Sequence, residues 1–335
     1  MTEPETRPPG VGSSDVPSPE LRPPDVRPDV EGVVPLDVGL DGMPGAICTY
    51  YLERPEPTLV DPGPSTSLEA LEAGLAGVGV ELSDLRHLLL THVHLDHAGA
   101  AGHLARTNPR LLVHVHQDGA AHLADPERLV ASTRRTFGDD HDRLWGEVVP
   151  VLRDRLRGWR PGDPRPLPGI RPLPTPGHIA HHLAWEVERS GVLLAGDALG
   201  LNLHAQAPSH PATPPPAVDL PEWYRTLDRR LAPVEVDAFG STHFGLHPDL
   251  HQRRVRLRVA LDALARRVAK AMAEGPEAEE ADAEAFQRES VELQGPFLSP
   301  ERAKGYFSCF PARTDWEGMR FFLSRNPNVL SELQS

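Results

Sequence analysis

Residues 85–100 read LRHLLLTHVHLDHAGA, and four side chains that can bind a metal stand here within six positions: His92, His94, Asp96 and His97. The apolar run before Thr91 predicts a buried strand. Alternate residues of an extended segment project to the same side, so His92 and His94 are expected to hold one ion together. Asp96 and His97 follow where the chain turns and are expected to face a second ion. The small residues at 98–102 are expected to let the backbone approach such a site. The alternative is a polar surface loop.

Three further candidates stand at predicted strand ends downstream of this loop. His178 follows Pro-Gly, Asp197 ends the run VLLAGD, and His243 ends the run VDAFGSTH. Imidazole and carboxylate ligands without a thiolate suit Zn²⁺ and would also accept Mn²⁺ or Fe. Seven ligands exceed the needs of one tetrahedral ion and fit two ions about 3.5–4 Å apart. Asp197 is the natural bridging carboxylate, with a bridging hydroxide as the nucleophile of a metal-assisted hydrolysis.

Other polar residues allow two interpretations. Asp61 ends the predicted strand at 57–63 and is either a turn residue or a buried carboxylate that orients the histidine loop, as is common at metal sites. His114 and His116 lie on a predicted strand and are interpreted as structural. His247 and His251 are spaced four apart and are interpreted as exposed histidines of a helix rather than metal ligands.

The rest of the chain divides by composition. Residues 1–30 are rich in Pro and charged residues and predict a disordered tail, residues 31–250 hold all the candidate ligands, and residues 251–335 predict a helical C-terminal extension. Within the middle part, the pattern predicts strands at 33–40, 46–53, 57–63, 111–115 and 236–243, helices at 96–106, across 120–160 and at 219–232, and a Pro-rich loop at 201–218.

Composition limits the classes of function. A net charge of −14 argues against a nonspecific polyanion binder, because such proteins neutralise phosphates with Lys and Arg. The two cysteines imply no disulfide framework. The first residues lack a secretory signal, and no apolar run approaches the roughly 20 residues of a membrane span. We therefore expect a soluble cytoplasmic protein; its oligomeric state stays open.

Taken together, THVHLDH (91–97), TPGH (175–178), AGD (195–197) and STH (241–243), preceded by LVDPG (59–63), resemble the metallo-β-lactamase superfamily. The resemblance implies an α/β (α+β) architecture, an αββα sandwich of two mixed β-sheets flanked by helices. It also implies that His92, His94 and His178 bind one metal, that Asp96, His97 and His243 bind the second, and that Asp197 bridges them. Asp96 would in addition act as the catalytic residue that orients the hydroxide or relays a proton, and Asp61 would support the site.

The sequence around TPGH and GDAL is most similar to the glyoxalase II-like (hydroxyacylglutathione hydrolase-like) branch. His182 matches the second histidine of that branch's pattern, while Ile179 and His181 differ from it. This resemblance implies a small-molecule substrate, a thioester, ester or lactone. The alternative is a phosphodiesterase or nuclease on the same fold, for which an arginine stripe at 253–267 would bind nucleic acid; otherwise those arginines form a solvated helix face.

Overall fold

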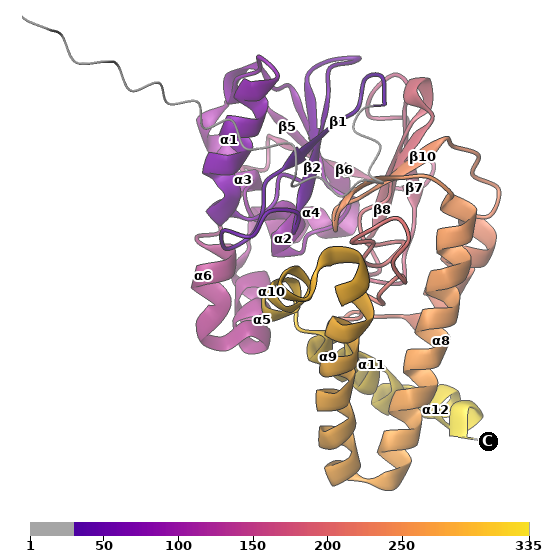
Figure 1. The fold of residues 1–335 in the computed structure, drawn as a ribbon. Helices are drawn as coiled ribbons and strands as arrows, with labels where there is room; N and C mark the ends of the chain where they lie inside the picture. The colour runs from indigo at the N-terminus through magenta and orange to yellow at the C-terminus, as the bar shows by residue number, and fades with distance from the viewer. Residues whose placement is uncertain (1–29, 335) are drawn as a thin grey trace, which may run out of the picture.

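The computed structural model describes residues 30–334, which form two β-sheets packed face to face with helices on the outer sides (Figure 1). The predicted αββα sandwich is confirmed. The tail predicted at residues 1–30 lies, except for Val30, outside the described residues. No helix within residues 30–334 combines the length and apolar composition needed to cross a membrane.

The first sheet has six strands in chain order. Its first three strands pair antiparallel, and β3 to β6 pair parallel. Because β3 and β4 are parallel neighbours, their C-terminal ends meet at one edge, which places Asp61 beside the histidine loop. The strands are β1 (Val34–Asp37), β2 (Cys48–Leu52), β3 (Thr58–Val60), β4 (His87–Leu89), β5 (Leu112–His116) and β6 (Leu156–Trp159).

The second sheet has five strands in the order β11-β10-β9-β8-β7. Its parallel pair, β9 and β10, again brings two strand ends together, and these lead to Asp197 and His243. The strands are β7 (Ile170–Pro174), β8 (Leu183–Val187), β9 (Val192–Leu194), β10 (Ala238–Ser241) and β11 (Gly245–His247).

Apolar side chains from both sheets fill the space between them. Leu89 of β4, Trp185 of β8 and Leu194 of β9 are buried in this core. Tyr50 of β2 also lies in it, and its hydroxyl donates a hydrogen bond to the carbonyl of Ser241 at 2.7 Å, which ties the two sheets together. Burial of this much apolar surface fixes the relative position of the two strand edges that carry the candidate ligands.

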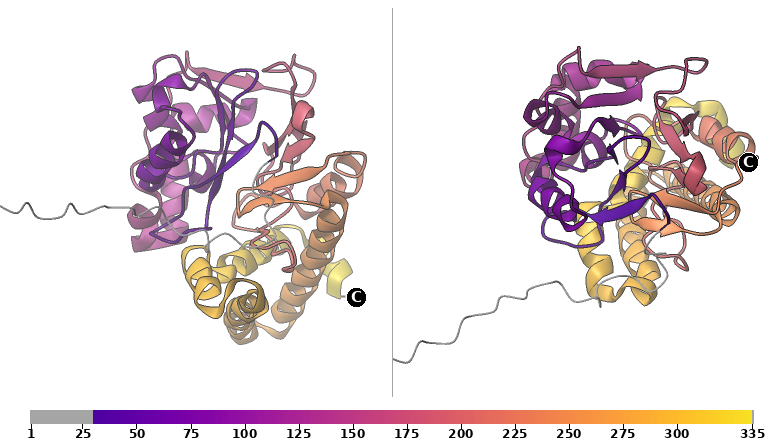
Figure 2. Two further views of the ribbon diagram at one scale, coloured as in Figure 1. Left: turned by 45° about the horizontal axis from the view of Figure 1, so that its top comes forward. Right: turned by 90° about the horizontal axis from the view of Figure 1, so that it is seen from above.

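Helices cover the outer faces of the sandwich, and a set of C-terminal helices closes one end of it (Figures 1 and 2). In these views α1 and α3 lie against the first sheet, while α8 runs beside the second sheet and forms a long hairpin with α9. The helices are α1 (Leu68–Gly77), α2 (Leu95–Ala98), α3 (Ala101–Thr107), α4 (Gln117–Ala124), α5 (Glu127–Phe137), α6 (His141–Trp145), α7 (Leu220–Arg225), α8 (Leu250–Glu274), α9 (Pro276–Leu298), α10 (Pro300–Cys309), α11 (Ala312–Arg325) and α12 (Pro327–Gln334).

Two local predictions are wrong. The helical pattern over 120–160 ends at Trp145, since Gly146 adopts a positive φ of 66°, and Leu156–Trp159 instead adds the edge strand β6 to the sheet. His247 is buried on β11, where its Nε2 contacts the Phe244 carbonyl at 2.8 Å. Of the arginines at 253–267, interpreted as a stripe or as a solvated helix face, Arg253 fits neither interpretation, because it is buried and donates hydrogen bonds to loop carbonyls at 204–207.

Candidate metal centre

Three imidazoles meet in a first ligand group at the open edge of the sandwich. His92 and His94 come from the loop after β4, and His178 comes from the loop between β7 and β8. His94 Nδ1 lies 2.9 Å from His92 Nε2 and 2.9 Å from His178 Nε2. The predicted alternation of His92 and His94 toward one point is therefore observed.

Two carboxylates and two imidazoles form a second group beside the first. Asp96 and His97 lie on the short helix α2, while Asp197 and His243 follow the parallel strands β9 and β10. Asp96 Oδ2 lies 3.2 Å from His243 Nε2 and 3.5 Å from His97 Nε2. All seven residues predicted as ligands thus gather in two adjacent groups.

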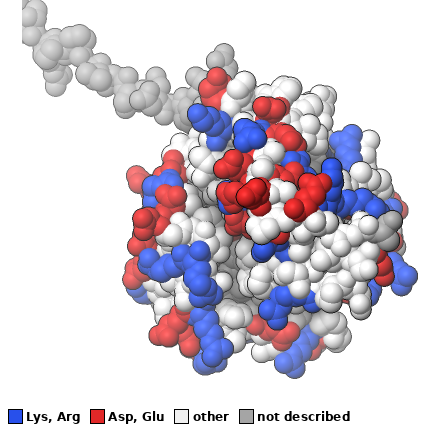
Figure 3. Space-filling view, turned by 90° about the horizontal axis from the view of Figure 1, so that it is seen from below, with Lys and Arg blue, Asp and Glu red and all other residues white. Residues whose placement is uncertain are grey.

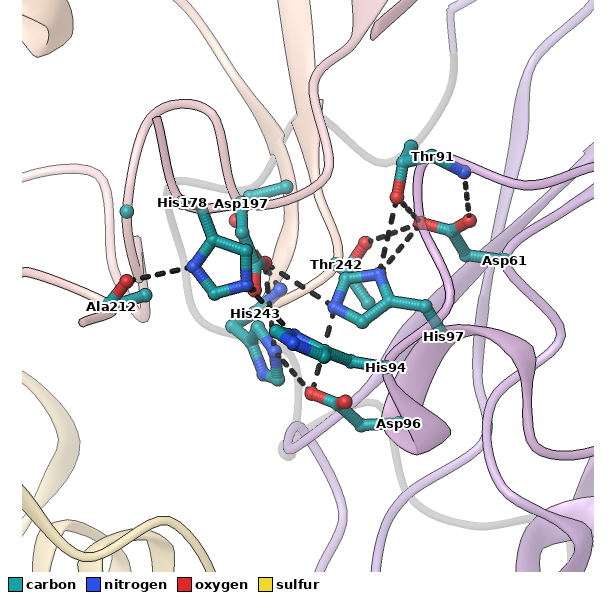
Figure 4. Close-up of polar contacts among 12 residues, drawn as sticks. Asp61, Thr91, His94, Asp96, His97, His178, Asp197, Ala212, Thr242 and His243 are labelled. Atoms are coloured by element: carbon teal, nitrogen blue, oxygen red, sulfur yellow. Dashed lines mark hydrogen bonds and ion pairs between the residues drawn. The ribbon is translucent and has the colours of Figure 1, made fainter. Parts of the chain in front are cut away.

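Asp197 stands between the two groups, with one carboxylate oxygen toward each (Figure 4). Its Oδ2 lies 3.4 Å from Nε2 of His178 and 4.0 Å from Nε2 of His92. Its Oδ1 lies 3.4 Å from Nε2 of His97 and 3.8 Å from Nε2 of His243. A carboxylate in this position can contact two ions at once.

The arrangement fits divalent cations. Lone-pair nitrogens of neutral imidazoles do not attract one another, yet three of them converge at hydrogen-bond distance. In the second group, His97 Nε2 and Asp197 Oδ1 are buried and have no hydrogen-bond partner within residues 30–334. Buried polar atoms without a partner are costly. A cation bound in each group would satisfy these atoms, and oxygen and nitrogen donors suit Zn²⁺, Mn²⁺ or Fe alike.

Burial and neighbouring charges give the two groups different protonation. Burial lowers the pKa of His94 to about 3 and that of His92 well below its usual value, with neighbouring imidazoles adding to the effect. Burial also acts to lower the pKa of His97, but the carboxylates of Asp197, Asp96 and Asp61 outweigh it and raise that pKa well above its usual value. His92 and His94 are therefore neutral nitrogen donors, whereas His97 holds a proton between carboxylates that a cation bound in the second group would displace.

Asp61 is a buried carboxylate that orients the histidine loop, not merely a turn residue. Its Oδ2 contacts His97 Nδ1 at 2.8 Å and accepts hydrogen bonds from the hydroxyls of Thr91 at 2.7 Å and Thr242 at 3.2 Å. Its Oδ1 accepts the Thr91 backbone N–H at 2.8 Å. With Nδ1–H of His97 donated to Asp61, Nε2 is left as the metal-facing nitrogen, as is common at metal sites.

His178 is oriented by backbone instead. Its Nδ1 donates to the Ala212 carbonyl at 2.7 Å, in the Pro-rich loop predicted at 201–218. The next residue, Thr213, donates its backbone N–H to Asp315 Oδ1 at 2.6 Å, and Asp315 Oδ2 contacts His210 Nε2 at 3.0 Å. Asp315 belongs to α11, so the C-terminal helices hold the segment that orients a candidate ligand.

His182, predicted as a supporting residue, lies in neither ligand group. Its Nε2 accepts the backbone N–H of Asp197 at 3.2 Å, and its Nδ1 contacts the Thr175 hydroxyl at 2.8 Å. It thereby fixes the backbone that presents Asp197. The small residues at 98–102 serve packing rather than close approach to a metal, since a Cβ on Gly102 would lie 1.8 Å from the Val149 carbonyl oxygen.

A cavity of about 400 Å³ opens onto both groups. His94, Asp96, His178, Asp197 and His243 line its floor. Its walls are largely apolar and come from three places that the ligand motifs do not mark: one face of α5, the Pro-rich segment 212–217, and residues 310–315 at the start of α11.

Several residues that build this site carried no motif. The Phe310 ring packs edge-on against the His243 ring with centroids 4.8 Å apart. His181, noted as a departure from the glyoxalase II pattern, lines the cavity and stacks on His122 with centroids 6.2 Å apart. Leu129 and Phe137 of α5 both pack against the hydrophobic core and line the cavity, so the apolar face of this helix did not by itself mark the cavity in the sequence.

Known proteins share this sequence pattern and fold. The profile of the metallo-beta-lactamase superfamily matches residues 48–243. The chain is 28% identical over 197 residues to the probable metallo-hydrolase YqjP of Bacillus subtilis, covering 51% of this chain and 58% of that protein. Shorter stretches are 32% identical to an N-acyl homoserine lactonase of a Bacillus species (37% of this chain, 42% of that protein) and 29% identical to a hydroxyacylglutathione hydrolase of Rhodopseudomonas palustris (42% and 44%).

A solved structure extends the likeness beyond the matched region. The metallo-beta-lactamase family protein TTHA1429 of Thermus thermophilus superposes with a TM-score of 0.60 at 25% identity, covering 89% of this chain and 94% of that one. The chain spans only about half the length of the curated relatives it matches. The family match covers more than half of the 335 residues and contains all seven candidate ligands. The chain therefore belongs to the metallo-beta-lactamase superfamily.

Proposed function

We propose that this chain is a hydrolase with two divalent metal ions, of which Zn²⁺ is the simplest choice, and that it cleaves a small-molecule thioester, ester or lactone. The observation that carries the proposal is the position of Asp197, whose two carboxylate oxygens face different ligand groups. His92, His94 and His178 would hold one ion, and Asp96, His97 and His243 would hold the other. Divalent ions supply a water acidic enough to act as a nucleophile at neutral pH and polarise the scissile carbonyl.

The protein's own groups set the geometry of the reaction. Asp61 and the Ala212 carbonyl hold two imidazoles with their Nε2 atoms toward the centre. Asp96 lines the cavity with a side chain that is 14% exposed, so its carboxylate would orient the attacking water or relay its proton. The apolar walls exclude bulk water and strengthen these electrostatic contacts.

Two features favour a small acyl substrate over a nucleic acid. The cavity is of the size that small ligands occupy, and its walls are mostly apolar. Two matched relatives are named for hydrolysis of a lactone and of an acylglutathione, which supports the thioester or lactone class and a glyoxalase II-like assignment. The alternative, a phosphodiesterase, loses one residue of its proposed arginine stripe, because Arg253 is buried. We keep a cytoplasmic location as part of the proposal.

The test is a side-by-side measurement of initial rates on S-lactoylglutathione, an acyl homoserine lactone and bis(p-nitrophenyl) phosphate with metal-replete protein. We expect turnover of the thioester or the lactone. Asp197→Ala should remove that turnover while leaving the circular dichroism spectrum unchanged. Preference for the phosphodiester would contradict the proposal.

A further inference from the structure

The cavity above the ligand groups has a charge pattern that the proposed chemistry does not explain. Two arginines, Arg128 and Arg135, line it from the same helix, α5. They are seven residues apart, which is two helical turns or about 10 Å, so both lie on one face. Leu129, Ser132 and Thr136 share that face and also line the cavity.

Neither guanidinium is neutralised by a residue of the described part of the chain. Within residues 30–334, Arg128 and Arg135 form no ion pair or side-chain hydrogen bond with another residue, whereas Arg134, between them in sequence, pairs with Asp142 at 2.6 Å. The basic side chains along one side of the hollow are visible in Figure 3, on the side where α5 and α6 lie.

The acidic residues of the cavity are all engaged elsewhere. Asp96 and Asp197 belong to the ligand groups, and Asp315 binds Thr213 N–H and His210. Arg128 and Arg135, which are exposed, therefore line an apolar cavity without a compensating anion among residues 30–334. The net charge of −14 makes this local excess of positive charge more notable.

We propose that the substrate is an acyl compound with an apolar part and an anionic group, a carboxylate or a phosphate, which Arg128 and Arg135 bind. This inference rests on the proposed hydrolase function and names the substrate class of the same site. The apolar part packs between α5, Ile179 and the segment 214–217, while the reacting carbonyl reaches the ligand groups at the floor. Arginine presents paired N–H donors that match both anions.

The test uses matched pairs of thioesters with metal-replete protein. S-Butyryl pantetheine is neutral and its 4′-phosphate carries the phosphate, while S-butyryl 3-mercaptopropionate carries a carboxylate and S-butyryl 3-mercaptopropionamide is its neutral match. We expect kcat/KM for at least one anionic thioester to exceed that for its neutral match by about tenfold, the effect of two partly exposed charge pairs. The double variant Arg128→Ala/Arg135→Ala should bring that ratio close to one. Whether the phosphate or the carboxylate compound is preferred identifies the anionic group of the substrate.

Arg134→Ala is the matched control, because it removes an arginine of the same helix that does not line the cavity, and the ratio should stay at its wild-type value. If the double variant keeps the anionic preference, or if wild-type protein shows none, the inference is wrong. Calorimetry with the corresponding S-butyl thioethers, which cannot be hydrolysed, separates the two proposals. If no thioester is turned over but the phosphorylated or carboxylated thioether still binds more tightly and loses that advantage in the double variant, only the hydrolase proposal fails.

Discussion

His97 and His178 face the same centre but are held by different parts of the molecule. His97 is fixed by a side chain, Asp61, which the first sheet presents from the end of β3. His178 is fixed by a main-chain carbonyl, that of Ala212, whose segment is held by Asp315 of α11. One support comes from inside the sandwich and the other from the C-terminal helices. The comparison shows that the helical extension is part of the metal centre's framework.

The largest effect is expected from Asp61→Asn. The amide would present a donor or a neutral oxygen to His97 Nδ1–H and to two threonine hydroxyls in place of a charged acceptor. Loss of such a support costs 10–100-fold in metal affinity, and we expect the upper end, about 100-fold, for one of the two ions. Competition titration with a chromophoric chelator measures it. Asp84→Asn, an exposed helix-capping acid, is the control and should leave both affinities unchanged.

Asp315→Asn tests the other support and should have a smaller effect. It acts through Thr213 and Ala212 before it reaches His178, so we expect about a tenfold loss of affinity, confined to the ion held by the histidine group. Co²⁺ absorption spectra during titration identify which ion is weakened. Glu317→Gln, on the exposed side of α11, serves as the control. An equal loss of affinity for both ions would contradict the account in which Asp61 and Asp315 support different ligand groups.

Gly318→Ala tests how closely α11 is docked on the Pro-rich segment. A Cβ at this position would lie 1.7 Å from the Thr213 carbonyl oxygen and 2.8 Å from Pro214, so backbone must move. We expect the free energy of unfolding in urea to fall by about 1–3 kcal/mol. Gly295→Ala on α9, where the nearest atom is 3.8 Å away, should be neutral or stabilising by up to about 1 kcal/mol. Equal changes in the free energy of unfolding for the two variants would show that α11 is not closely packed on the Pro-rich segment.

The last effect concerns pH and a histidine outside the centre. Burial, with a contribution from the neighbouring His87, lowers the pKa of His114 on β5 to about 3. In the unfolded chain this histidine titrates near 6.5, so between these values only the unfolded state binds the proton. Its contribution to stability is therefore complete above about pH 6.5 and is lost as the pH falls toward 3, by at most about 1.4 kcal/mol per pH unit.

The measurement is urea unfolding of wild-type protein and of His114→Gln at pH 7 and pH 5. The stability difference between the two proteins should shrink or change sign at pH 5, because the variant no longer has this acid penalty. His251→Gln on α8, whose side chain is 45% exposed, is the control and should track the wild type. If His114→Gln has the same pH profile as the wild type, the buried imidazole is not the sensitive group.

The part of the centre that is built and supported by side chains could be predicted from sequence. His92, His94, Asp197 and His243 follow strands of parallel pairs, which bring strand ends to one edge, while His178 lies between the antiparallel strands β7 and β8. Asp61 was visible for the same reason, although its role as a turn residue or a buried support could only be decided from its contacts.

The support of His178 by a main-chain carbonyl could not be predicted. Ala212 acts through its carbonyl, which any residue has, and Asp315 lies 103 positions away from it, with no motif linking the two. Position in the fold also decided His247, which has a helix-like spacing to His251 but lies on a buried strand. The edge strand β6 arose where the local pattern favoured helix, because pairing with β5 outweighed local propensity.

The most direct test of the two-ion centre is metal content against activity. Protein stripped with a chelator is titrated with Zn²⁺, and bound metal per chain is measured by mass spectrometry under native conditions while thioester hydrolysis is followed. We predict two ions per wild-type chain, with full hydrolysis only after the second, and fewer ions and no hydrolysis for Asp197→Ala. Full activity with a single bound ion, or unchanged activity in Asp197→Ala, would contradict a centre built around a carboxylate shared by two ligand groups.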